Sequence, residues 1–172
     1  MKSIDCLTVK YHNRVVGILS LTPDDKFCAF EYDKSWLADG FSISPLELPL
    51  RQGLFIAKPQ PFYGNFGIFE DSLPGGYGEY LLRKVLKKSG IDPMGLTSVQ
   101  WLSIVGSSGM GALCYVPETK LLRENSKCSF DEMQQMALDV LSEKTNDNAD
   151  MLYFKSGNSG GVRSRSEERF SR

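Results

Sequence analysis

The chain has 172 residues, of which 41% are hydrophobic and 24% charged, and its formal net charge is -1. These values predict a soluble globular protein with one domain, or with one domain and a fragment of a second. The near-neutral balance excludes a protein drawn to nucleic acid by its overall charge, so we expect no direct nucleic-acid binding. No apolar run approaches the roughly 20 residues of a membrane span. No secretory signal opens the chain, so we expect a cytoplasmic protein that does not contact membranes.

The cysteines are too far apart to form a metal site. Cys6, Cys28, Cys114 and Cys128 make no C-x-x-C pair, and His12 is the only histidine. Structural zinc requires clustered thiolates or imidazoles. We therefore expect reduced thiols and no metal.

Three apolar segments open the chain, at residues 6–10, 15–21 and 27–32. His12-Asn13 and residues 22–25 supply turn residues between them, which predicts an antiparallel meander. Next, Asp33 is expected to cap a short helix that ends at Gly40. Residues 44–50 are expected to be extended, because two prolines disfavour helix at the residues before them. Trp36 and Trp101 lie in apolar contexts and are expected in the core.

Residues 77–88 predict an amphipathic helix, with Tyr77, Leu81 and Val85 on one stripe and Gly90 as its end. It follows a proline-terminated break, in which the adjacent Glu70 and Asp71 suit a helix-end cap better than acid–base catalysis.

Asp92 and Pro93 are typical of a helix start, here predicted to run through Leu102. Residues 106–111 then read as a hairpin turn before a buried strand at 112–116.

Ser129 and Glu132 form a capping box that predicts another helix. Residues 146–150 read as a polar linker, and a short apolar strand follows at 151–154. Residues 162–172 have no helix or strand period, which predicts a mobile tail.

The best chemical candidate is the loop at residues 157–161. A strand followed by glycines can bring backbone N–H groups close to phosphate, because no Cβ blocks the approach. The loop matches neither the dinucleotide nor the phosphate-loop pattern, and a flexible linker is the alternative. His12 has no catalytic-triad partner recognisable by spacing.

Several short groups of residues are distinctive in combination. They are VVGIL at 15–19, FEY at 30–32 with WLA at 36–38, LELPL at 46–50, FEDSLP at 69–74, and LSIVG at 102–106 leading to MGAL at 110–113. In this order and spacing, across most of residues 4–165, the chain resembles the N-terminal part of the HipA family of bacterial toxin kinases. No single motif would be specific.

The resemblance implies an α+β fold. Residues 1–118 would form a HipA-type N-terminal subdomain, a small antiparallel β-sheet or barrel with packed helices. Residues 119–150 would be a helical connection and linker. Residues 151–165 would begin a kinase N-lobe with its Gly-rich loop, and residues 166–172 would be a mobile tail.

The resemblance also implies a nucleotide-binding loop. Its residues would be Gly157, Asn158, Ser159, Gly160 and Gly161, together with Arg165. Asparagine stands where the family's regulatory S-x-x-G loop has its phosphorylated serine, so Ser159 or Ser156 would replace it only in a shifted register. Arg165 stands in place of a lysine that would meet the nucleotide phosphates, and its planar fork is no simple substitute for an ammonium.

The family's catalytic and metal-binding aspartates lie in a further lobe, so the resemblance implies no catalytic and no metal-binding residue in these 172. Phosphoryl transfer depends on such groups. ATP and Mg²⁺ would bind only if a kinase core completed the site, and we expect no phosphotransfer from this chain alone.

Three interpretations follow from the resemblance. The first is a truncated or split toxin-kinase module that contacts a HipA-like kinase core or a HipB-like helix-turn-helix antitoxin. The second is a subunit that contributes its ATP loop to a serine/threonine-protein kinase completed in trans. The third is a non-functional gene remnant.

Overall fold

The computed structural model describes residues 4–109 and 111–119. The chain divides into two compact units. Among the described residues, the first unit holds those up to Leu73 and those of Leu96–Thr119, and the second holds Pro74–Gly95. None of the helices in this described part is long and apolar enough to cross a membrane.

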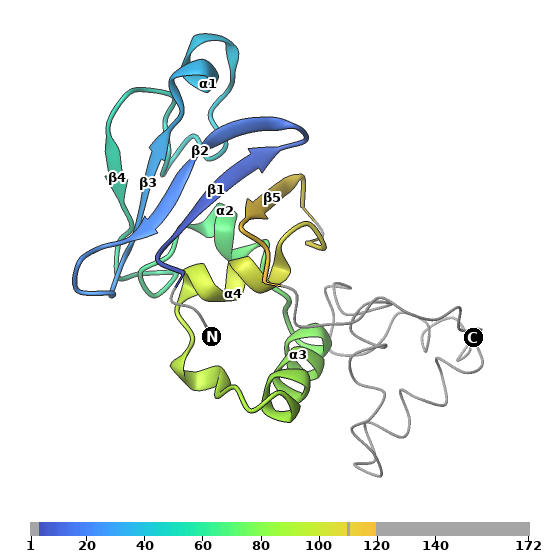
Figure 1. The fold of residues 1–172 in the computed structure, drawn as a ribbon. Helices are drawn as coiled ribbons and strands as arrows, with labels where there is room; N and C mark the ends of the chain where they lie inside the picture. The colour runs from blue at the N-terminus through green and yellow to red at the C-terminus, as the bar shows by residue number, and fades with distance from the viewer. Residues whose placement is uncertain (1–3, 110, 120–172) are drawn as a thin grey trace, which may run out of the picture. The chain divides into compact units, whose positions relative to one another are not determined.

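The first unit is built on a five-stranded antiparallel sheet with the order β4-β3-β2-β1-β5. The first three strands form the predicted meander, which confirms that part of the sequence analysis, and the mixed fold confirms the predicted α+β class. Figure 1 shows β5 completing the sheet beside β1. The strands are β1 (Cys6–Tyr11), β2 (Arg14–Leu21), β3 (Cys28–Tyr32), β4 (Leu54–Ile56) and β5 (Leu113–Val116).

The strand register places two different rows of side chains on the two faces of the sheet. Alternate residues of a strand point to opposite faces. The inner row runs across four strands and consists of Leu7, Leu19, Phe30 and Phe55, all buried. The outer row, one residue away, runs across all five strands and consists of Val116, Thr8, Ile18, Glu31 and Leu54.

Two helices cover the inner face, α2 (Gly67–Glu70) and α4 (Ser98–Val105), and both lie on the same side of the sheet in Figure 1. Phe69 of α2 is fully buried. Its ring lies 5.4 Å from that of Phe30, 5.8 Å from that of Phe66 and 6.3 Å from that of Tyr115, measured between centroids. Aromatic pairs at such separations stabilise a core beyond their area burial. Phe69 is thus the centre of the first unit's core.

The short helix α1 (Lys34–Asp39) follows the predicted pattern. The Asp33 side chain accepts hydrogen bonds from the Ser35 hydroxyl and from the Ser35 backbone N–H, the latter at 2.8 Å, and these two bonds hold its pKa below the ordinary value. At the other end, the Gly40 N–H donates to the Trp36 carbonyl at 2.7 Å. A Cβ at Gly40 would lie 2.4 Å from that same carbonyl oxygen, so only glycine fits. Trp36 is buried as expected.

The prediction that residues 44–50 are extended is wrong. The chain makes a turn there, in which the Leu48 N–H donates to the Ser44 carbonyl at 2.7 Å. Proline restricts its own φ and the residue before it, so Leu46 and Glu47, which lie between the restricted positions, are free to turn. The Tyr32 hydroxyl fixes the turn by donating to the Leu48 carbonyl at 2.7 Å, and Leu46 projects from it, 97% exposed.

The helix predicted from Asp92 through Leu102 is two elements. A 3₁₀ turn, η1 (Pro93–Gly95), ends after three residues, and α4 begins separately behind Thr97. Thr97 and Gln100 form a capping box with both reciprocal hydrogen bonds present, a start signal that outweighs continuation from Pro93. Trp101, expected in the core, is only half-buried.

The segment at residues 106–111 is not a hairpin turn, since it connects α4 to β5. Gly106 ends α4 with φ +53°, and the Tyr115 N–H donates to its carbonyl at 3.1 Å. A Cβ at Gly106 would lie 2.3 Å from the Glu118 side chain, so this helix end requires glycine.

The second unit holds α3 (Tyr77–Lys88), whose bounds are those predicted. Its buried residues are Tyr77, Gly78, Leu81, Leu82, Val85 and Leu86. Arg83 and Glu79 pair across one helical turn at 2.7 Å. Gly90 adopts φ +73° just beyond the helix, as expected of a glycine that ends one.

Candidate functional site

The predicted nucleotide-binding loop lies outside the described residues. This applies to Ser156, Gly157, Asn158, Ser159, Gly160, Gly161 and Arg165. The predicted capping-box helix from Ser129, the linker, the strand at 151–154 and the tail lie outside them as well. Their roles therefore stay predictions, as do the predicted domain boundaries.

The LELPL and FEDSLP segments meet at α2. The Glu47 carboxylate accepts a hydrogen bond from the backbone N–H of Gly67, the first residue of α2, at 2.8 Å. The first N–H groups of a helix have no partner within it, so Glu47 satisfies one of them across 20 residues of chain. A Cβ at Gly67 would lie 2.7 Å from the Phe62 ring. This contact builds the fold and leaves that carboxylate oxygen engaged.

Ser72 joins the end of FEDSLP to β5. The Tyr115 hydroxyl donates to Ser72 Oγ at 2.6 Å, and Ser72 Oγ donates to the Ile68 carbonyl at 3.3 Å. Both side chains are buried, and burial raises the pKa of the Tyr115 phenol far above its ordinary value. The phenol therefore stays protonated at neutral pH and acts as a structural donor.

The adjacent carboxylates have separate roles. Glu70 accepts a hydrogen bond from the Asn65 amide at 2.8 Å. Asp71 is the C-cap residue of α2, and its backbone N–H bonds back into the helix while its side chain is exposed. The interpretation of this pair as a helix end, rather than as an acid–base pair, agrees with the geometry.

The thiols and the histidine form no reactive cluster in the described part of the chain. Burial raises the pKa of Cys28 to about 12, so this thiol is protonated at neutral pH and is a poor nucleophile. Cys6 and Cys114 are also free thiols. His12 is exposed in the β1–β2 turn, with its ring 4.4 Å from that of Tyr11. No group of three or more metal-ligating side chains occurs among the residues that the structure describes, 4–109 and 111–119.

The outer row is the first surface that suits recognition. Leu54 is 61% exposed, Ile18 54% and Val116 42%, and they lie in one row across the sheet. Glu31 is exposed between Ile18 and Leu54. No sequence pattern predicts this row, because β2 shows no clean alternation and β4 is too short to be recognised.

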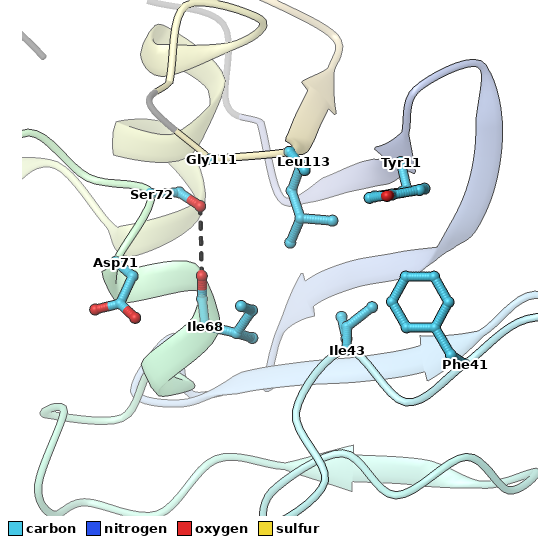
Figure 2. A pocket seen from close by; sticks show the side chains of 9 residues that line it. Tyr11, Phe41, Ile43, Ile68, Asp71, Ser72, Gly111 and Leu113 are labelled. Atoms are coloured by element: carbon cyan, nitrogen blue, oxygen red, sulfur yellow. Dashed lines mark hydrogen bonds between the residues drawn. The ribbon is translucent and has the colours of Figure 1, made fainter.

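A pocket of about 200 Å³ is the second such surface. Figure 2 shows Tyr11 and Phe41 at one end of it and Asp71 at the other, with Ser72 and Leu113 between them. The residues that line it come from β1, the loop after α1, α2 with the turn after it, and the start of β5; they are Tyr11, Phe41, Ile43, Ile68, Asp71, Ser72, Gly111, Ala112 and Leu113. No local sequence signal brings these segments together, so sequence reasoning could not find it.

Comparison with known proteins agrees with this architecture. The model of the HipA N-terminal domain family matches residues 7–116. A chain from the complex of HipA, HipB and operator DNA of the Shewanella oneidensis MR-1 toxin–antitoxin system has the same fold, with a TM-score of 0.53. The two chains are 22% identical, and the match covers 77% of this chain and 29% of the other. Among curated proteins, none gives a significant match.

The family match spans well over half of the 172 residues and includes the whole five-stranded sheet apart from its first residue. The chain therefore belongs to the HipA N-terminal domain family.

Proposed function

We propose that this chain is a protein-contact module of a HipA-type toxin–antitoxin system. The observation that carries the proposal is the outer row, which crosses all five strands of a HipA-type sheet and presents three exposed apolar side chains, Val116, Ile18 and Leu54, with Thr8 and Glu31 between them. Exposed apolar residues that gather on one face, unlike scattered ones, mark interaction surfaces.

Two polar side chains of the family-like motifs, Glu47 and Ser72, support this proposal because they are engaged in the fold itself. Glu47 caps α2, and Tyr115 holds Ser72. Groups already committed to internal hydrogen bonds are not available to a substrate without loss of stability. The described part of the chain is thus a structural scaffold, and its exposed outer row is the surface that can contact other molecules.

The proposed partner is a protein of the same system, either a HipA-like kinase core or a HipB-like antitoxin. The chain similar in fold comes from a complex that contains HipA and HipB. The outer row suits an apolar partner surface with a cation opposite Glu31, since a charge at an interface requires an opposite charge to offset its desolvation. On this proposal the chain by itself transfers no phosphate, and ATP matters only together with a kinase core.

Co-expression with the products of neighbouring genes tests the proposal. The full chain should co-elute with a HipA-like or HipB-like product at a defined stoichiometry, measured by size-exclusion chromatography with light scattering. The identity of the co-eluting product decides whether the partner is the HipA-like kinase core or the HipB-like antitoxin. Co-elution with neither would contradict the proposal.

Phosphotransfer is tested separately with radiolabelled ATP, on the chain alone and on any complex. Label incorporated by the purified chain alone would contradict the proposed dependence on a kinase core.

A further inference from the structure

The pocket between Tyr11 and Asp71 has the size and lining of a side-chain receptor. Its volume is about 200 Å³. An apolar protein cavity of roughly 150 Å³ accommodates benzene. The pocket therefore has room for one aromatic ring or one branched aliphatic side chain.

The aromatic end of the pocket is held in place by its own packing. The Tyr11 ring meets the Phe41 ring edge to face, with centroids 5.4 Å apart and planes at 89°. Phe41 in turn packs on Trp36 at 5.2 Å, and the Trp36 indole N–H donates to the Phe41 carbonyl at 2.9 Å. Phe41 is nevertheless 50% exposed. A partner's apolar group could cover that surface without displacing a core residue.

The two polar side chains at the other end of the pocket, Ser72 and Asp71, differ in whether they already have bonding partners. The Ser72 hydroxyl is engaged with Tyr115 and Ile68. The Asp71 carboxylate is exposed and has no ion pair among the described residues. A free carboxylate beside an apolar pocket favours a ligand with a positive charge next to its apolar group.

From this combination we propose that the pocket binds a bulky apolar side chain adjacent to arginine or lysine in a segment of a partner protein. The apolar side chain fills the space between Tyr11, Phe41 and Leu113, and the cation lies against Asp71. The inference rests on the proposed protein-contact function, for which it names the kind of segment recognised. It concerns a different surface from the outer row.

Short peptides test the pocket directly. The probe is the acetylated and amidated tetrapeptide GFRG, titrated into the ¹⁵N-labelled full chain and followed by NMR. We expect saturable shifts centred on the amides of Tyr11, Phe41 and Leu113. GARG, which lacks the ring, should give none, and GFQG should bind about two- to fivefold more weakly, the scale of one exposed ion pair. Shifts centred elsewhere, or equal shifts with GARG, would overturn the inference.

Two glycines provide a matched pair of variants. A Cβ at Gly111 would have its nearest neighbours, Ser72 Oγ and the Leu113 nitrogen, at 3.9 and 4.0 Å, so the Cβ that Gly111→Val introduces fits there, and its two methyl groups add volume at the pocket. A Cβ at Gly95, remote in sequence from the lining residues, would meet nothing within 4 Å. Gly111→Val should abolish GFRG binding and Gly95→Val should preserve it. Asp71→Asn should remove the preference for GFRG over GFQG. Unchanged binding by Gly111→Val would overturn the inference.

The failure of this inference is distinguishable from the failure of the proposed function. A complex with a neighbouring gene product that forms equally with Gly111→Val, while GFRG produces no shifts at the pocket, overturns the pocket and leaves the contact function standing. Absence of any such complex overturns the contact function, whereas the peptide titration still decides what the pocket binds.

Discussion

The two faces of the sheet are formed by neighbouring residues of the same strands, yet they differ in burial and in polarity. On the inner face, Leu19 is fully buried against the core that is centred on Phe69. On the outer face, Ile18 is 54% exposed and lies beside the Glu31 carboxylate. An antiparallel sheet is stable with only one face covered. The inner face therefore accounts for stability, and the outer face is available for recognition.

The largest expected effect comes from placing a charge on the inner face. Leu19→Asp buries a carboxylate without a partner, which should cost more than about 4 kcal/mol and remove most of the stability of a domain at the low end of the ordinary range. The matched control is its neighbour, Ile18→Asp, whose free energy of unfolding should fall by only about 1 kcal/mol, the scale of one unfavourable exposed strand position beside Glu31. Circular dichroism with urea titration measures both. Equal destabilisation by the two variants would show that the faces do not differ in this way.

The next effect tests the centre of the inner core. Phe69→Ala removes a fully buried ring that contacts three other aromatic rings, and should destabilise the first unit by about 3–5 kcal/mol. Tyr63→Ala is the control, because Tyr63 is 84% exposed; its change should stay within about 0.5 kcal/mol. Urea midpoints give the comparison. A loss below about 1 kcal/mol for Phe69→Ala would contradict the central position of this ring.

A smaller effect concerns the hydrogen bond between Tyr115 and Ser72. Tyr115→Phe and Ser72→Ala should each destabilise the protein by about 1–2 kcal/mol, because each leaves a buried hydroxyl without one of its partners. The double variant should cost less than the sum, with a coupling of about 1 kcal/mol in a double-mutant cycle. Strict additivity would mean that the two hydroxyls do not interact in solution.

The smallest effect is an alkaline loss of stability that depends on Cys28. Its pKa is raised from 9.0 to about 12, so the folded state holds this proton more tightly than the unfolded state. The stabilisation is therefore complete below about pH 9 and declines as the pH rises toward 12. Between about pH 8.5 and about pH 10 the loss should be about 1 kcal/mol, measured by urea unfolding. Cys28→Ala should remove most of this decline and leave the smaller part due to Tyr115, whose pKa is also raised, whereas Cys6→Ala should retain it in full; a decline undiminished in Cys28→Ala would assign it to another group.

Local signals were enough to predict part of this fold from the sequence. The turn residues between the first three strands predicted the meander, and the apolar stripe of residues 77–88 predicted α3 with its bounds. Asp33 and Gly40 gave both ends of α1. Each of these elements is specified by residues within one or two turns of itself.

The features that sequence reasoning missed depend on distant contacts. The turn at residues 44–48 is fixed by the Tyr32 hydroxyl, and α2 begins where Glu47 reaches Gly67. The outer row exists only through the pairing of five strands, and the pocket only through the meeting of separate segments. The capping box at Thr97 is different, since T-x-x-Q is a local helix-start signal, and it outweighs the competing signal at Pro93 on which the prediction relied.

The central claim is that the outer row contacts a partner protein, and the affinity of the complex tests it most directly. Isothermal titration calorimetry should compare the full-length wild type, Ile18→Asp and Leu46→Asp against the co-eluting HipA-like or HipB-like protein. Leu46 is the control because it is equally apolar and more exposed, but lies in the turn after α1 and outside the outer row. We predict that Ile18→Asp raises Kd by about tenfold or more, as expected for a central interface residue, and that Leu46→Asp leaves Kd unchanged. An unchanged Kd for a folded Ile18→Asp would contradict the account.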